Sequence, residues 1–202
     1  MQKYNTDYHT EREEPMMRRR LMAVVLAGVL AAPLAAYAKE LAGATMPDTL
    51  SVGGKTLKLN GLGLAKKTLV KVYVAGLYLE APSKDAAAIL ASNQTKAVRM
   101  HFLRNGSKKQ LTDHFKEGFE ANAKEKAAAQ QSDVDKFLAM ISDMKAGEEL
   151  IFTYVAGTGT TFSKGDKVIG VLDGKDFGDV LYAVWLGPVP PSEDLKNGML
   201  GM

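Results

Sequence analysis

The chain has 202 residues, of which 46% are hydrophobic and 24% are charged, the balance of a globular protein with material for one core. Its formal net charge is only +3, and lysines are interspersed with carboxylates along the chain, which excludes a basic surface for nucleic acid. The absence of cysteine excludes disulfides and thiol chemistry, so we expect the hydrophobic core alone to hold the fold together.

Residues 16–38 have the three regions of a secretory signal peptide. Three arginines at 18–20 form the positive region, residues 21–32 are apolar, and Ala-Tyr-Ala at 36–38 is a cleavage site. The apolar run is shorter than the roughly 20 residues that span a bilayer, which favours a cleaved signal over an uncleaved anchor. We therefore expect residues 1–38 to be leader and signal peptide and residues 39–202 to be one exported domain, with no stable membrane span after the signal is removed.

The same segment predicts where the protein acts. The periplasm of a Gram-negative cell is the expected location, with secretion to the medium as the alternative. Residues 1–15 are polar and are unusual before a positive region, so Met1, Met16 and Met17 are all candidates for the first residue.

The first half of the exported domain is predicted to be mainly β-structure. Gly53-Gly54 can adopt the positive φ angles of a two-residue turn, which predicts a hairpin over residues 49–59. Residues 68–79 are rich in β-branched and aromatic side chains, which is typical of a strand. A short helix capped by Ser83 then leads to another strand over residues 97–103.

The second half is predicted to contain helices, then strands, then helices. Apolar residues at helical spacing indicate amphipathic helices over residues 107–126 and 132–142. The elements expected after them are strands over 149–155, 160–162 and 167–172, a helix from the cap Asp176 to the stop at Gly187, and a last helical turn from Ser192 to Leu200. This order is not a βαβ alternation, so it predicts an α+β fold in which helices pack on one face of an antiparallel sheet.

Sequence motifs for cofactors and catalysis are weak. Gly61-Leu62-Gly63 and Gly157-Thr158-Gly159 do not complete a dinucleotide fingerprint, and we interpret both as turns. A Gly-x-Ser-x-Gly hydrolase motif is absent. His101 and His114 lack the cysteines or the His-x-x-x-His spacing of a metal site, and His101 is interpreted as a structural residue rather than a haem ligand. The residues therefore predict no metal, no cofactor and no catalytic residue.

The strand over residues 68–79 carries the best candidate for ligand binding. Its alternation places Tyr73 and Val74 on opposite faces, with Tyr73 among apolar side chains. A buried tyrosine hydroxyl needs a hydrogen-bond partner, which is either a backbone group or the polar end of a ligand.

Several blocks of the sequence, taken in order, resemble the chalcone isomerase-like family. The blocks are residues 59–67, 71–79, 99–104, 117–122, 154–161, 174–177 and 185–188, within a span of about residues 46–201. The resemblance implies an open-faced β-sandwich, in which a large antiparallel sheet is covered on one face by a layer of helices. It also implies a ligand cleft between the sheet and the helices.

The family includes plant enzymes that close a chalcone into a flavanone, and this sequence does not match their polar residues. The positions of those residues fall on Tyr73 and near Leu111, Gly118 and Val184. The resemblance therefore implies no catalytic residue in this chain.

Other family members bind fatty acids, with an arginine and a strand tyrosine holding the carboxylate. Tyr73 matches that tyrosine, whereas the arginine position falls on Ala65, with Lys66 and Lys67 beside it. Tyr73, Lys66 and Lys67 are therefore the expected ligand-binding residues, although a lysine lacks the two-pronged hydrogen bonding of an arginine.

The expected function is thus a non-catalytic exported binder of a small apolar or amphipathic molecule, such as a fatty acid. One alternative is an isomerase or intramolecular lyase of the chalcone isomerase type on an unknown substrate. Another is a haem-associated or protein-partner module, since some relatives have been linked to haem.

Overall fold

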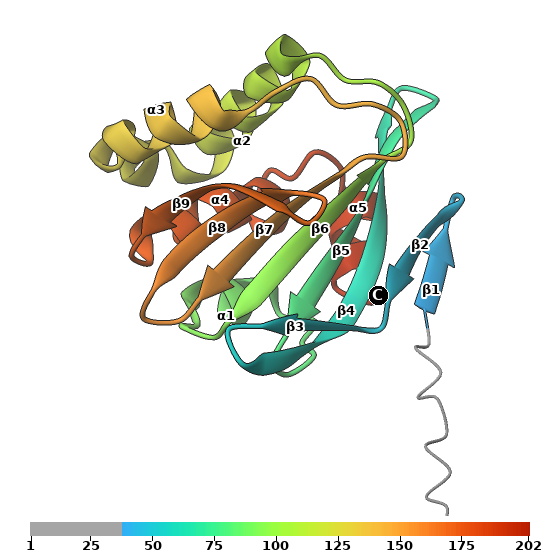
Figure 1. Ribbon diagram of the computed structural model, residues 1–202, viewed down its shortest axis with the longest axis horizontal. Coiled ribbons are helices and arrows are strands. Elements are labelled where there is room, and N and C mark those ends of the chain that lie inside the picture. Colours follow the sequence, from blue (N-terminus) through green and yellow to red (C-terminus); the bar gives the residue numbers. More distant parts are fainter. Residues whose placement is uncertain (1–37) are drawn as a thin grey trace, which may run out of the picture. The chain divides into compact units, whose positions relative to one another are not determined.

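The computed structural model describes residues 38–202, which form a seven-stranded sheet, a two-stranded sheet and five helices (Figure 1). The strands are β1 (Ala38–Leu41), β2 (Ala44–Pro47), β3 (Thr49–Val52), β4 (Lys55–Lys67), β5 (Val70–Leu79), β6 (Lys96–Phe102), β7 (Glu149–Val155), β8 (Gly159–Lys164) and β9 (Lys167–Asp173). The helices are α1 (Ala86–Ala91), α2 (Lys108–Ala129), α3 (Gln131–Met140), α4 (Asp176–Leu186) and α5 (Glu193–Met199). The expected leader and all but the last residue of the expected signal peptide lie outside the described residues.

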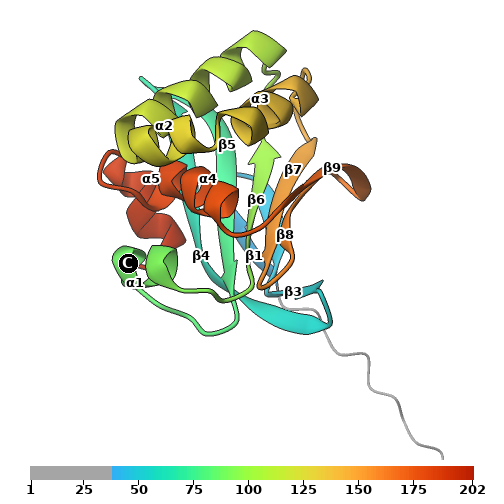
Figure 2. The ribbon, with the colours of Figure 1, turned by 90° about the vertical axis from the view of Figure 1, so that its left-hand side faces the viewer.

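The large sheet is an antiparallel meander in which each strand pairs with the next one in the chain, from β3 to β9. Helix α1 connects β5 to β6, and α2 and α3 connect β6 to β7. The helices lie on one face of the sheet (Figure 2). The expected α+β fold, with an antiparallel sheet covered by helices on one face, is confirmed.

Aromatic side chains fill the layer between the sheet and the helices. Helix α4 is apolar nearly all round, and nine of its eleven residues are buried, as expected of a helix enclosed by other elements. The rings in mutual contact within this layer belong to Phe115, Phe119, Phe137, Phe152, Phe162, Phe177 and Trp185. Burial of one such ring stabilises the fold by roughly 1.5–3 kcal/mol, so this layer is the main core.

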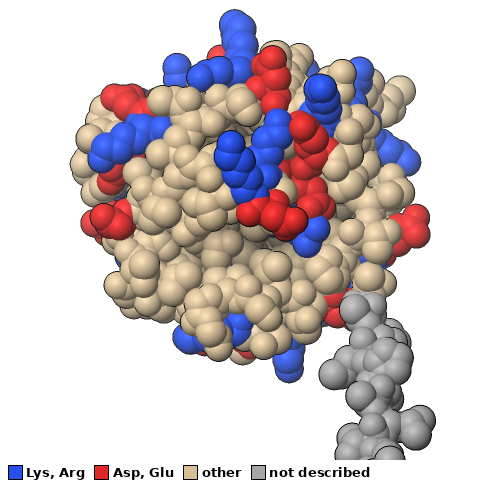
Figure 3. All heavy atoms as spheres, in the orientation of Figure 1, with Lys and Arg blue, Asp and Glu red and all other residues tan. Residues whose placement is uncertain are grey.

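The opposite face of the large sheet is more open. Ala44 and Met46 of β2 pack against Val74 there, and the Tyr78 hydroxyl donates a 2.9 Å hydrogen bond to the carbonyl of Pro47. Figure 3 shows a hollow of uncharged side chains near the middle of the molecule on the side that it displays.

The segment Gly61-Leu62-Gly63 is part of β4, so its interpretation as a turn is wrong. These glycines serve the packing of α5, because a Cβ atom on Gly61 would collide with the carbonyl of Gly198. A Cβ atom on Gly63 would likewise collide with the carbonyl of Leu195. Glycine is therefore required here for the close approach of a helix to a strand.

Two expected helix caps are also wrong. Helix α1 begins after Asp85, whose side chain accepts from the first turn, while Ser83 donates its backbone N–H to Asn60 on β4 over 2.7 Å. Asp176 is the first residue of α4, and Lys175 at the cap position makes no side-chain capping bond. The turn predicted at Gly157-Thr158-Gly159 connects β7 to β8, with Gly159 as the first residue of β8.

Candidate functional site

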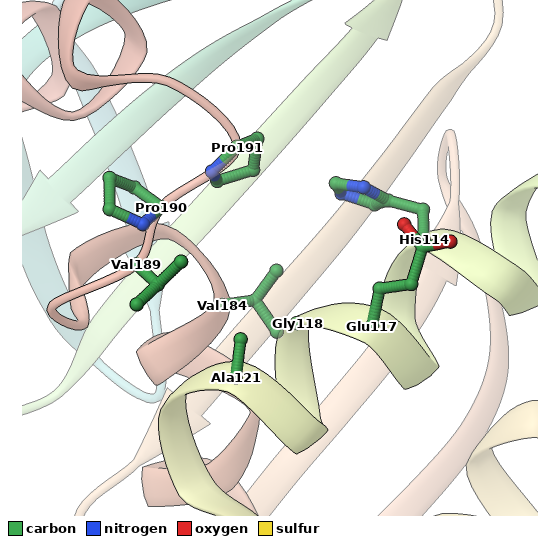
Figure 4. Close-up of a pocket in the computed structure, with 8 residues that line it drawn as sticks. All are labelled: His114, Glu117, Gly118, Ala121, Val184, Val189, Pro190 and Pro191. Atoms are coloured by element: carbon green, nitrogen blue, oxygen red, sulfur yellow. The ribbon is translucent and has the colours of Figure 1, made fainter.

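A cleft of about 190 Å³ opens between α2 and α4 (Figure 4). Most of the side chains along it are apolar, its two polar side chains come from α2, and its exposed lining is about as polar as it is apolar. The residues that line it are His114, Glu117, Gly118, Ala121, Val184, Val189, Pro190 and Pro191. Figure 4 shows the His114 ring extending from α2 toward Pro191, with Glu117 on the same helix, so these two side chains form a polar corner of the cleft.

The cleft owes its shape to two local features. Gly118 allows α2 to approach α4 closely, since a Cβ atom there would lie 2.8 Å from Val184. Asn122 holds the rim, because its amide donates to the Val189 carbonyl over 2.8 Å and accepts from the Val189 N–H over 2.7 Å. This pair of hydrogen bonds fixes the segment that follows α4 beside α2.

A chain of three polar side chains runs inward from the polar corner. The Nε1 of Trp185 donates to the Tyr73 hydroxyl over 3.3 Å, and that hydroxyl lies 3.4 Å from the Nε2 of His114. Tyr73 is only 4% exposed, so its β5 position brings it beneath α2 and α4. These three side chains therefore connect the cleft to the core.

Burial sets the protonation states of His114 and Tyr73. Burial lowers the pKa of His114 below its usual value, with the charge of Glu117 acting weakly in the opposite direction. Burial also raises the pKa of Tyr73, against a smaller lowering effect of the Trp185 hydrogen bond. Since indole N–H groups only donate, the Tyr73 hydroxyl accepts from Trp185, and its single proton is free to point to a neutral His114.

A family model described as chalcone isomerase-like matches residues 38–201. The chain belongs to the chalcone isomerase-like family. Among solved structures, a fatty-acid binding protein of Arabidopsis thaliana is similar with a TM-score of 0.63, over 81% of this chain and 96% of that chain. At 12% sequence identity this likeness shows the fold alone. A comparison with curated proteins found no significant match.

The structure separates the three expected ligand-binding residues of this chalcone isomerase-like chain. Tyr73 lies under the cleft, whereas Lys66 and Lys67 are exposed at the end of β4, just past a register shift that follows Ala65. Ala65 is the residue that pairs with Tyr73. Neither lysine lines the cleft, and the binding role of all three residues stays a prediction.

Two of the positions at which the resemblance aligned the polar residues of the plant enzymes lie at this cleft. Gly118 and Val184 both line it, and Leu111 is a buried core residue one turn before His114 on α2. None of these three side chains can donate a hydrogen bond.

His114 and Trp185 are site residues that the sequence reasoning missed. Helical spacing does place His114 beside Leu111 and Gly118 on the inward face of α2, which was the available signal. The contact of His114 with Tyr73 joins positions 41 residues apart, and that of Trp185 with Tyr73 joins positions 112 apart. Local periodicity carries no information on pairs so distant in the chain.

His101, the other histidine of the domain, lies away from this cleft. Its Nδ1 is 3.3 Å from the carboxylate of Glu149, which also receives two hydrogen bonds from Arg99. Within residues 38–202 no cluster of three potential metal ligands occurs, and none of the helices there is long and apolar enough to cross a membrane.

Lys96 is a buried charge that this cleft does not use. It is 1% exposed and donates to the carbonyls of Ile89 and Ser92 at the end of α1, over 3.0 and 3.3 Å. Its ammonium also lies over the rings of Tyr154 and Tyr182. Burial lowers the pKa of Lys96 to about 8.

Proposed function

We propose that this chalcone isomerase-like protein is a non-catalytic binder of a small apolar or amphipathic molecule, held in the cleft between α2 and α4. The observation that carries the proposal is the row of apolar side chains in this cleft beside a polar corner formed by His114 and Glu117. Such a corner would orient the polar end of a ligand while the apolar side chains receive its apolar part. The cleft of about 190 Å³ is smaller than a typical drug-sized pocket of about 300–1,000 Å³, so it suits a short molecule or one end of a longer one.

A fatty acid is the ligand suggested by the Arabidopsis thaliana protein, whose fold this chain shares. A carboxylate in the polar corner would meet a His114 that is neutral by burial and lies beside the acidic Glu117. Protonation of His114 would supply the positive charge that a carboxylate requires. We therefore propose that acids bind more tightly at mildly acidic pH, whereas uncharged alcohols bind independently of pH.

Trp185 makes the proposal easy to test, because it is the sole tryptophan of the chain and its indole contacts Tyr73 under the cleft. Titration with dodecanoic acid and with dodecanol, followed by tryptophan fluorescence and calorimetry, should give saturable binding of at least one of them. Ala121→Phe should fill the cleft and weaken that binding more than about tenfold, which is about 1.4 kcal/mol. Ala128→Phe, at another exposed alanine seven residues further along α2 and outside the cleft, is the matched control. Equal binding by the two variants would refute this site.

Lys66 and Lys67 enter the proposal as a second source of counter-charge. Neither ammonium lines the cleft, so a carboxylate would reach them only by lying against the end of β4. Under that arrangement, Lys66→Gln and Lys67→Gln should weaken binding of dodecanoic acid and leave dodecanol unaffected. Unchanged binding of both probes would leave His114 as the polar contact.

We also propose that the protein is exported to the periplasm. The support is the sequence pattern of residues 16–38, in which a positive region, a short apolar run and an Ala-x-Ala site follow one another. Fractionation of the native cells, with the protein detected in the periplasmic extract, tests this location.

One observation favours a second candidate function, an isomerase or intramolecular lyase. A neutral histidine at the mouth of a cleft, hydrogen-bonded to a buried tyrosine, has the protonation state that a general base requires. The cleft offers no side-chain donor at the positions of Gly118 and Val184, so we place this candidate second.

A further inference from the structure

The hairpin between β4 and β5 exposes apolar side chains at its tip. Thr68 and Leu69 form its two-residue turn, because Lys67 pairs with Val70. Leu69 is 91% exposed and Val70 is 43% exposed, which makes Leu69 the most exposed large apolar residue of the described chain. Thr68 has a φ of +56°, a conformation that β-branched residues rarely adopt. Two-residue turns favour glycine, asparagine and aspartate, so neither solvation nor turn geometry explains a Thr-Leu tip.

Basic side chains surround this tip. Lys66, Lys67 and Lys71 are exposed on the two strands, and Arg104 lies beside them, because the N–H of Leu103 donates to the Val72 carbonyl. None of these four cations forms an ion pair with a described residue. We call the set the tip patch, consisting of Lys66, Lys67, Leu69, Val70, Lys71 and Arg104.

Acidic residues are absent from the segments that form the tip patch. Residues 59–79, which contain the hairpin, include no aspartate or glutamate, and neither do residues 96–112 around Arg104. Glu148, on the loop before β7, is already paired with Lys164 over 2.7 Å. The tip patch is therefore a cluster of unneutralised positive charge around an exposed apolar centre.

We propose that the tip patch docks onto a lipid surface with anionic headgroups. An apolar side chain at a protruding tip can enter the boundary between headgroups and acyl chains, while lysines and arginines around it contact the headgroup phosphates. Anionic membranes attract such basic residues within a Debye length of the surface. The other exposed apolar residues, Val168 and Val171 among them, lie on other elements of the fold.

The position of the tip patch also relates it to the cleft. Tyr73, under the cleft, is three residues from Val70 along the same strand. A membrane bound at the tip would therefore lie at the end of β5 nearest to the polar chain of Tyr73 and His114. The docking itself does not rest on the proposed function, since it requires no ligand in the cleft.

Vesicle co-sedimentation of the protein isolated from its native cells tests this proposal. Vesicles of phosphatidylglycerol and phosphatidylcholine in equal parts should bind the protein, and pure phosphatidylcholine vesicles should bind it far more weakly. The triple variant Lys66→Gln, Lys67→Gln, Lys71→Gln should partition onto these vesicles roughly a hundredfold more weakly, because each lysine contributes about fivefold. Its binding should also lose most of its dependence on salt. Leu69→Asp should lose about tenfold or more. Val168→Asp, at a valine that is 56% exposed on β9, is the matched control and should bind as the parent does.

A second measurement uses the absence of cysteine from the chain. A single cysteine introduced as Leu69→Cys can carry an environment-sensitive dye, whose emission should shift to the blue on anionic vesicles. The same dye on Val168→Cys should not shift. Equal binding to neutral vesicles, equal binding by Leu69→Asp, or self-association of the protein that Leu69→Asp removes without any vesicle binding would each overturn the proposal. No soluble ligand is present, so such a failure would not affect the assignment of the cleft.

Discussion

The indole Nε1 of Trp185 donates a 3.3 Å hydrogen bond to the hydroxyl of Tyr73 and so joins α4 to β5 beneath the cleft. Both side chains are buried, and the same hydroxyl lies within 3.4 Å of His114 on α2. The hydroxyl oxygen of Tyr73 thus connects α4, α2 and the sheet. A change at Tyr73 should therefore affect both the stability of the fold and the cleft.

We predict that Tyr73→Phe lowers the free energy of unfolding by about 1–3 kcal/mol, because it leaves the buried Trp185 N–H without an acceptor. Urea denaturation followed by the fluorescence of Trp185 measures the loss. Tyr78→Phe, which removes a single bond to the Pro47 carbonyl on the other face, should cost about 1 kcal/mol and serves as the comparison. A Tyr73→Phe variant as stable as the parent would show that the bond to Trp185 contributes nothing.

Acidification should destabilise the protein through His114. Burial lowers the folded-state pKa of His114, so below its usual value of 6.5 the unfolded chain binds more protons than the folded one. Stability is therefore fully present above pH 6.5 and is lost as the pH falls toward the lowered pKa. Thermal melting between pH 8 and pH 5 should show a smaller decrease for His114→Gln than for the parent. Parallel decreases in the two proteins would assign the acid sensitivity to other groups.

Lys96 should make stability depend on pH in the alkaline range. Its pKa is about 8 in the folded state and 10.5 ordinarily, so between these values the unfolded chain binds more protons and stability rises with pH. Below pH 8 the lysine is charged in both states and the contribution is constant. The stability of the parent minus that of Lys96→Met should increase by about 1–3 kcal/mol from pH 7.5 to pH 10. Taking this difference cancels the titration of tyrosines, and a difference that stays constant would contradict the assignment.

Chalcone should not be cyclised by the purified protein measurably faster than it cyclises in buffer. That reaction requires donors placed where charge develops on the carbonyl oxygen, each worth about 100-fold or more in rate. Gly118 and Val184 in the cleft and the buried Leu111 provide none. Absorbance of chalcone over time measures the rate. Rapid turnover that disappears in His114→Ala would instead establish the isomerase as the function.

Under the proposed export, we predict that the mature protein begins at Lys39. Ala36 and Ala38 suit the small pockets that signal peptidase requires, and cleavage after Ala38 removes only the first residue of β1. Pairs between β1 and β2 from Lys39 to Leu41 remain after such cleavage. Intact-mass measurement of protein from the native cells decides the point, and a mass that retains residues 16–38 would show that the signal is not cleaved.

The sequence by itself determined most of the fold of this protein. Gly53-Gly54 specified the hairpin of β3 and β4, and the spacing of Leu111, Phe115 and Phe119 specified the inward face of α2. The order of the elements then specified an antiparallel sheet with helices on one face. These signals are local, because turn geometry and hydrophobic periodicity act between residues a few positions apart.

Only the tertiary structure decided the candidate site. Tyr73 was predicted as a binding residue, but its partners His114 and Trp185 come from helices 41 and 112 residues further along the chain. The same is true of Gly61, whose missing side chain makes sense only when α5 crosses β4. Contacts of this kind depend on how the helices pack on the sheet, and packing follows from the shapes of all the buried side chains together. No pattern along one segment of the chain contains that information.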